Sequence, residues 1–146
     1  MIGRAGLILA VMVAARGLSA QRQLDVSPAG PYRTIASAVA AARAGDRVVV
    51  HAGVYREPLV TIDKPLMLEG DGSPVLDGEY KHGLILVTAD DVTVRGLVLR
   101  DVGTSFVEDR AALRVTAARG CTIERNRIEN GFFGIYLANK IGRAHV

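Results

Sequence analysis

Apolar and polar residues alternate in short runs along this chain, and two of the runs are copies of each other. Residues 85–99 (ILVTADDVTVRGLVL) align with residues 113–128 (LRVTAARGCTIERNRI). A third copy begins at residues 134–137 (GIYL), which match residues 112–115 (ALRV) at an offset of 22. A unit this short cannot bury its own apolar face and must stack on a neighbouring copy. The pattern therefore predicts an all-β coil of parallel strands.

Apolar runs separated by turn residues predict three short strands in each coil. Asp, Asn, Gly and Pro cluster between the runs, as is typical of tight or left-handed turns. A first strand is expected at residues 48–50, followed by a corner at 53–55. The coils after it are expected to use residues 59–62, 66–68 and 75–76, then 84–87, 92–94 and 97–99, then 113–115, 121–123 and 127–128, with 135–137 opening a fourth coil.

One helix is expected before the stack of coils. Thr34 is suited to the N-cap position, residues 35–44 carry the helical pattern, and Gly45 is suited to the end. We expect this amphipathic helix to cover the open end of the core, which would otherwise expose apolar side chains and unpaired strand edges. Its apolar face consists of Ile35, Ala38, Val39 and Ala42.

The ends of the chain differ in pattern from the repeat. Residues 1–20 have a basic start, an apolar run too short to span a bilayer, and small residues at the end. We expect a signal peptide there, with an uncleaved membrane anchor as the alternative. The polar residues 21–33 are interpreted as a linker, and residues 34–139 as the N-terminal part of the β-helix domain. Residues 140–146 (KIGRAHV) break the repeat, and we expect a non-native, adapter-derived tail.

Net charge gives no support for binding to nucleic acid. The formal charge is +3, but four of the 18 basic residues lie in the two end segments, which leaves 14 against 15 acidic residues. Basic residues also form no continuous run. We therefore expect no nucleic-acid partner and no membrane span in the mature chain. The single cysteine, Cys121, rules out an internal disulfide and fits an inward-facing core position.

Two insertions interrupt the repeat. The first residues of successive coils are 25, 29 and 22 apart, so the longer coils must contain loops, at residues 78–83 (GEYKHG) and 103–110 (GTSFVEDR). Insertions project from the corners of a coil and often lie on a binding face. The second loop is the candidate interaction loop, with a solvated loop as the alternative. Its candidate residues are Phe106, Glu108, Asp109 and Arg110.

Five further residues have expected structural roles. Gly45 and Asp46 form the turn after the helix, and Gly53 and Tyr55 form the next corner. Asn126 lies at a corner of the third full coil, where an amide side chain can bond the backbone of a neighbouring coil.

The sequence resembles the NosD family over residues 30–139. The resemblance is carried by residues 45–55 (GDRVVVHAGVY), 64–78 (KPLMLEGDGSPVLDG), 89–105 (ADDVTVRGLVLRDVGTS) and 124–139 (ERNRIENGFFGIYLAN). It implies a right-handed parallel β-helix in an exported, periplasmic protein. It also implies a non-enzymatic accessory role in assembling the copper site of nitrous oxide reductase, with protein partners from that maturation system.

Metal and catalytic sites have little support from the residues. Copper would need clustered His, Met or Cys, but Met67 and Cys121 fit core positions, and His51 and His82 lie in different corners. We expect no metal and no cofactor. The alternative function is a carbohydrate-active β-helix enzyme acting on an acidic polysaccharide, and a third possibility is a structural solenoid. Turn formation explains most of the acidic residues, so none is assigned as catalytic: Asp63, Asp77, Asp90, Asp91, Asp101, Glu108 and Asp109.

Overall fold

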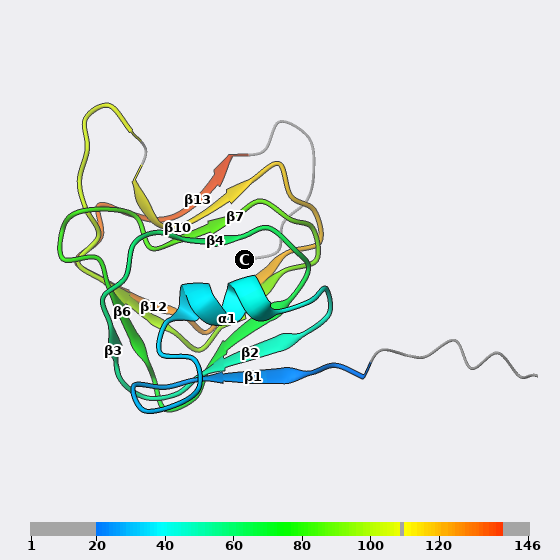
Figure 1. Ribbon diagram of the computed structural model, residues 1–146. Coiled ribbons are helices and arrows are strands. Elements are labelled where there is room, and N and C mark those ends of the chain that lie inside the picture. Colours follow the sequence, from blue (N-terminus) through cyan, green and yellow to red (C-terminus); the bar gives the residue numbers. More distant parts are fainter. Residues whose placement is uncertain (1–19, 109, 139–146) are drawn as a thin grey trace, which may run out of the picture.

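The computed structural model describes residues 20–108 and 110–138, which form thirteen short strands and one helix (Figure 1). The signal peptide expected at 1–20 and the tail expected at 140–146 lie outside the described residues, apart from Ala20. The elements are β1 (Gln23–Val26), α1 (Ile35–Ala41), β2 (Arg47–Val50), β3 (Val54–Tyr55), β4 (Val60–Ile62), β5 (Met67–Gly70), β6 (Val75–Asp77), β7 (Ile85–Val87), β8 (Thr93–Arg95), β9 (Val98–Arg100), β10 (Ala111–Thr116), β11 (Thr122–Glu124), β12 (Arg127–Glu129) and β13 (Phe133–Ala138).

The strands form three parallel sheets that together make a coil. Sheet 1 has the order β1-β2-β5-β8-β11, sheet 2 the order β13-β10-β7-β4, and sheet 3 the order β12-β9-β6-β3. From β2 onward, consecutive strands along the chain belong to different sheets, and each strand pairs in parallel with the strand one coil away. This arrangement confirms the expected parallel β-helix, and Figure 1 shows the chain winding around a common centre.

The register of the strands follows the aligned repeats. Val115 lies opposite Val87, Ile123 opposite Val94, and Leu113 opposite Ile135. Leu113 pairs with Ile85, as the alignment of residues 85–99 with residues 113–128 predicts. Since side chains alternate between the two faces of a strand, the structure fixes which residues of each coil point inward.

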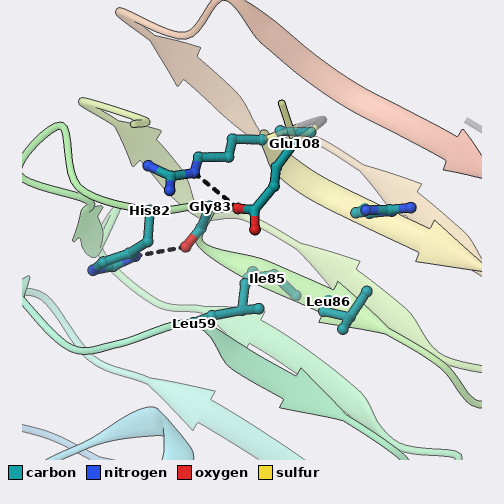
Figure 2. A pocket seen from close by; sticks show the side chains of 9 residues that line it. Leu59, His82, Gly83, Ile85, Leu86 and Glu108 are labelled. Atoms are coloured by element: carbon teal, nitrogen blue, oxygen red, sulfur yellow. Dashed lines mark hydrogen bonds and ion pairs between the residues drawn. The ribbon is translucent and has the colours of Figure 1, made fainter. Parts of the chain in front are cut away.

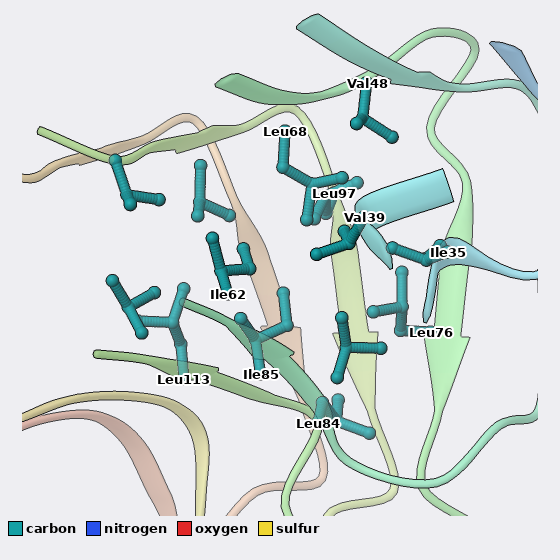
Figure 3. Close-up of a cluster of buried hydrophobic side chains, with 14 of the residues drawn as sticks. Ile35, Val39, Val48, Ile62, Leu68, Leu76, Leu84, Ile85, Leu97 and Leu113 are labelled. Carbon is teal, nitrogen blue, oxygen red and sulfur yellow. The ribbon is translucent and has the colours of Figure 1, made fainter. Parts of the chain in front are cut away.

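The inward positions form one continuous apolar core (Figure 3). Ile62, Ile85 and Leu113 from successive strands of sheet 2 are fully buried, as is Cys121. Ile85, for example, lies opposite Val60 of the preceding coil and Leu113 of the following one, so no coil has a core of its own. The core therefore depends on the number of coils that stack in register.

Helix α1 covers the first end of the coil, as expected, but it is shorter than predicted. It contacts β1, β2 and β4, and its Ile35, Ala38 and Val39 are buried. The Thr34 hydroxyl accepts a hydrogen bond from the amide of Ser37. Ala42 already has extended backbone angles, so the helix ends at Ala41 instead of Ala44.

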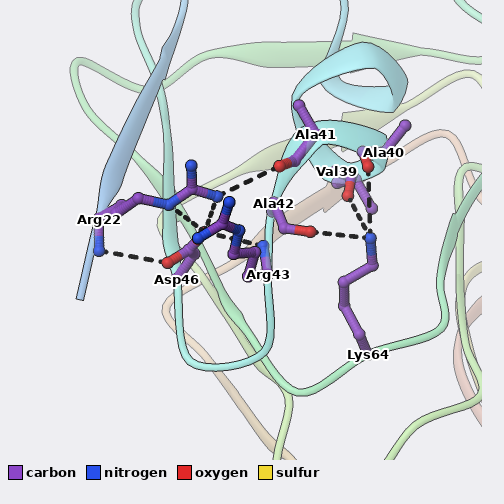
Figure 4. Close-up of polar contacts among 8 residues, drawn as sticks. All are labelled: Arg22, Val39, Ala40, Ala41, Ala42, Arg43, Asp46 and Lys64. Atoms are coloured by element: carbon purple, nitrogen blue, oxygen red, sulfur yellow. Dashed lines mark hydrogen bonds and ion pairs between the residues drawn. The ribbon is translucent and has the colours of Figure 1, made fainter. Parts of the chain in front are cut away.

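Charged side chains bind both ends of α1 and fasten it to the coil. The Glu57 carboxylate accepts hydrogen bonds from the amides of Ile35 (2.9 Å) and Ala36 (2.8 Å). At the other end, the Lys64 ammonium donates to the carbonyls of Val39 (3.0 Å) and Ala42 (2.9 Å) (Figure 4). An anion at the N-terminus and a cation at the C-terminus both complement the helix dipole.

Two predictions for the first coil are wrong. Part of the expected linker, residues 21–33, forms β1, which pairs with β2 and buries Leu24 and Val26. The alternation of Gln23, Leu24, Asp25 and Val26 is itself a strand pattern, which the neighbouring prolines obscured. The expected corner at 53–55 contains β3, because its residues pair with β6.

Opposite charges alternate from coil to coil on the outer faces. Glu69 accepts hydrogen bonds from Arg47 (2.7 Å) on the preceding coil and Arg95 (3.2 Å) on the following one. On sheet 3, the Asp77 carboxylate accepts a hydrogen bond from Arg100 (3.0 Å) on the following coil. Burial alone would raise the pKa of Glu69, but the two guanidiniums together lower it. These pairs favour the observed register, since a slip of one residue would place Val94 or Gly96 opposite Glu69 instead of Arg95.

The substitution Lys64→Met tests the cap. It removes the cation that binds the last carbonyls of α1, and we expect it to lower the free energy of unfolding by about 1–2 kcal/mol. Urea denaturation followed by circular dichroism measures this. Lys81→Met is the control, because Lys81 only pairs with the half-exposed Glu79; equal losses in both variants would contradict the role given to Lys64.

Candidate interaction site

The two insertions lie side by side. The Gly103 amide donates a hydrogen bond to the His82 carbonyl (3.0 Å), and Arg110 Nη1 donates to the Lys81 carbonyl (2.8 Å). Loop 78–83 precedes β7 and loop 103–110 precedes β10, and these two strands pair directly. The pairing therefore brings together two segments that are far apart in the sequence.

A pocket of about 340 Å³ opens where the loops meet the outer face of sheet 2 (Figure 2). Its apolar lining comes mainly from the strands, and its charged lining comes from the loops and from Arg114 on β10. The lining residues are Leu59, His82, Gly83, Ile85, Leu86, Glu108, Arg110, Ala111 and Arg114. We call this cavity the loop pocket.

Most polar groups of the loop pocket already have partners. Arg110 Nε lies 3.4 Å from Glu108 Oε2, and His82 Nδ1 lies 2.6 Å from the carbonyl oxygen of Gly83. Arg114 differs, because its Nε is shielded from solvent and has no hydrogen-bond partner among residues 20–108 and 110–138. Its guanidinium carbon lies 5.4 Å from the centre of the Tyr136 ring, which is cation–π distance.

The strand pattern explains why Arg114 faces outward. It lies between the buried Leu113 and Val115 on β10, so its side chain points to the opposite face. The register places it between Leu86 on β7 and Tyr136 on β13. Arg114 is thus held between an aliphatic and an aromatic neighbour on the surface of sheet 2.

A second, more apolar pocket of about 220 Å³ lies beside the first. Phe106 and Val107 at the tip of the second loop are fully exposed, and Phe132 is largely exposed. The Ser105 hydroxyl accepts hydrogen bonds from the amides of Val107 (3.2 Å) and Glu108 (3.1 Å), which shapes the tip. The pocket is lined by Thr104, Ser105, Phe106, Arg110, Phe132 and Phe133. We call it the aromatic pocket.

The candidate interaction loop thus supplies residues to both pockets. Phe106 lines the aromatic pocket, Glu108 lines the loop pocket, and Arg110 lines both. Asp109 lies outside the described residues. The sequence did not lead us to expect Arg114, Phe132 or Phe133 at the site. A usable signal existed for Arg114, because it is a charged residue between two inward positions of β10.

Three of the residues with expected structural roles hold neighbouring segments of backbone together. Gly45 has a φ of +87°, a conformation that glycine adopts without strain, and its amide donates to the Pro65 carbonyl. The Tyr55 hydroxyl is buried and donates to the His51 carbonyl (2.7 Å). The Asn126 side chain accepts from the amide of Leu97 (3.1 Å), one coil away.

The Asp46 carboxylate lies in the turn after α1 and accepts hydrogen bonds from several donors (Figure 4). It is buried, pairs with Arg22 Nη2 (2.7 Å), and accepts a hydrogen bond from the Arg43 amide (2.8 Å). These contacts, that of Arg22 above all, lower the pKa of Asp46 to about 2. Asp46 therefore joins β1, the end of α1 and β2. Gly53 lies in the next corner, where a Cβ atom would come within 3.1 Å of Pro28 Cγ.

The residues weighed as copper ligands are not brought together. His51 lies between Asp25 (2.8 Å) and Asp71 (3.3 Å) on sheet 1, and the bond to Asp25 raises its pKa. His82 lies at the loop pocket, and Cys121 is in the core. Within residues 20–108 and 110–138, no three His, Cys, Asp or Glu side chains are grouped so that they could hold a metal ion.

The described part of the chain contains no helix that is both long and apolar enough to cross a membrane.

The chain is similar to one curated protein along much of its length. Over 92 residues it is 36% identical to a Pseudomonas aeruginosa protein named probable ABC transporter binding protein NosD. The aligned segment covers 62% of this chain and 21% of the relative, so the match spans about a fifth of that protein. No family model matches the chain, and no solved structure matches it. The comparison agrees with the resemblance seen in the sequence.

The substitution Asp46→Asn tests the role of the buried carboxylate through its pH dependence. Because the pKa of Asp46 falls from 3.8 to about 2 on folding, the ionised group stabilises the folded state above pH 3.8. That contribution decreases as the pH falls below 3.8 and is lost near pH 2.

We therefore expect Asp46→Asn to lower the urea midpoint at neutral pH, and the difference from the wild type to shrink toward pH 2. Asp63→Asn, at an exposed corner, is the control and should change little at any pH. A difference that stays constant over the whole pH range would show that ionisation of Asp46 does not matter.

Proposed function

We propose that this chain belongs to an exported accessory protein that helps assemble the copper site of nitrous oxide reductase by contacting partner proteins in the periplasm. The observation that carries the proposal is the similarity to a NosD-named protein over 62% of the chain. The parallel β-helix fits it, because a rigid solenoid presents its loops as a fixed surface.

The surface around the two insertions supports a role in protein contact. Phe106 and Val107 are fully exposed at a loop tip whose backbone is held by Ser105. Exposed aromatic anchors beside pockets and charged groups are characteristic of protein interfaces, where a few such side chains supply most of the binding energy. We therefore place the partner-binding surface on the candidate interaction loop.

The alternative of a carbohydrate-active enzyme gains no specific support from the described residues. Asp77 and Glu69 are bound by arginines of neighbouring coils, and Glu108 in the loop pocket lies beside Arg110. A glycosidase mechanism commonly needs two carboxylates that face each other across the substrate. We therefore propose the accessory role as the function of the chain.

Deletion of the gene in its own host tests the proposal. We expect the deletion strain to export nitrous oxide reductase that lacks copper and activity, and the wild-type gene to restore both. A gene with Phe106→Ser and Val107→Ser should restore them poorly. Val54→Ser, which removes a half-exposed apolar residue elsewhere, is the matched control.

Cell fractionation of the same strains checks the expected periplasmic location. An active, copper-loaded reductase in the deletion strain would overturn the proposed function.

A further inference from the structure

The loop pocket contains a cation whose charge is not balanced within the described residues. Arg110 lies beside Glu108, whereas Arg114 makes no ion pair with a described residue and has a buried Nε without a partner. We infer that the loop pocket binds one acidic side chain of a protein partner, and that an apolar side chain of the same segment enters the aromatic pocket. This inference rests on the proposed function and specifies the chemistry of the partner.

The geometry of Arg114 suits a carboxylate. A shielded donor without a partner destabilises the free protein, and an oxygen acceptor relieves that cost. The Tyr136 ring lies within cation–π distance of the guanidinium and limits its orientation. A planar, oriented guanidinium can donate two parallel hydrogen bonds to one carboxylate.

The apolar lining favours a peptide over an acidic sugar. Leu59 and Leu86 border the loop pocket and can cover the methylene groups of a glutamate, but they offer a sugar hydroxyl no hydrogen bond. Arg110 lines both pockets, so the aromatic pocket is directly adjacent and can take a neighbouring aromatic side chain. The partner segment should therefore combine Glu or Asp with an aromatic or aliphatic residue.

A titration with small peptides tests the site on the full chain. The probe is acetyl-Glu-Phe-amide, followed through the arginine Nε–H resonances by NMR. We expect the Arg114 resonance to shift and saturate with this peptide, and acetyl-Gln-Phe-amide to bind about tenfold more weakly because it lacks the charge.

Matched variants separate the site from general electrostatics. Arg114→Met should weaken the Glu peptide about tenfold, which is the usual effect of removing a charged hydrogen-bond partner. Arg119→Met removes an exposed arginine at another corner and should leave binding unchanged. Equal affinity for the Glu and Gln peptides, or equal losses in both variants, would overturn the inference.

Glucuronate is the competing ligand. If it saturates the Arg114 shift and the Glu peptide does not, the site binds acidic sugars and the peptide inference is wrong. The test can distinguish a failure of the inference from a failure of the proposed function. If Arg114→Met abolishes peptide binding in vitro but an Arg114→Met strain keeps a fully active nitrous oxide reductase, the site stands and its link to that enzyme fails.

Discussion

The parallel register between neighbouring coils is the constraint on which the rest of this structure depends. Each strand has only three to six residues in sheet 2, and its inward side chains are covered by those of the strands above and below. A slip of one residue would turn Leu113 and Val115 outward and bring Arg114 into the core. The register therefore determines both the stability of the coil and which residues lie on its surface.

Polar contacts reinforce the register at the capped end of the coil and on its outer faces. At the first end, Glu57, Lys64 and Asp46 fasten α1 and β1 over the core, so that apolar residues of the first coil are not left open to water. On the outer faces, pairs such as Glu69 with Arg95 join successive coils. Each exposed pair contributes little alone, but all of them favour the same alignment.

The sequence predicted the fold well because the repeat and the inward pattern are local signals. It identified the strands of sheet 2, the capping helix and the insertions, since each depends on spacing along the chain. It failed at β1, where Leu24 and Val26 alternate too briefly to stand out beside prolines. It also failed to find Arg114, whose importance depends on Tyr136 one coil away and on loops that precede two different strands. A site assembled across coils has no contiguous sequence signal.

The surface follows from the same constraint. Because β7 and β10 pair in register, the loops before them meet, and the row Leu86, Arg114 and Tyr136 runs beneath them. Interstrand nuclear Overhauser effects in the full chain test this arrangement most directly. The account predicts backbone contacts from Arg114 to Leu86 on one side and to Tyr136 on the other. A set of contacts along the whole of β10 that fits a register shifted by one residue, with Arg114 paired to Ile85 or Ile135, would contradict it.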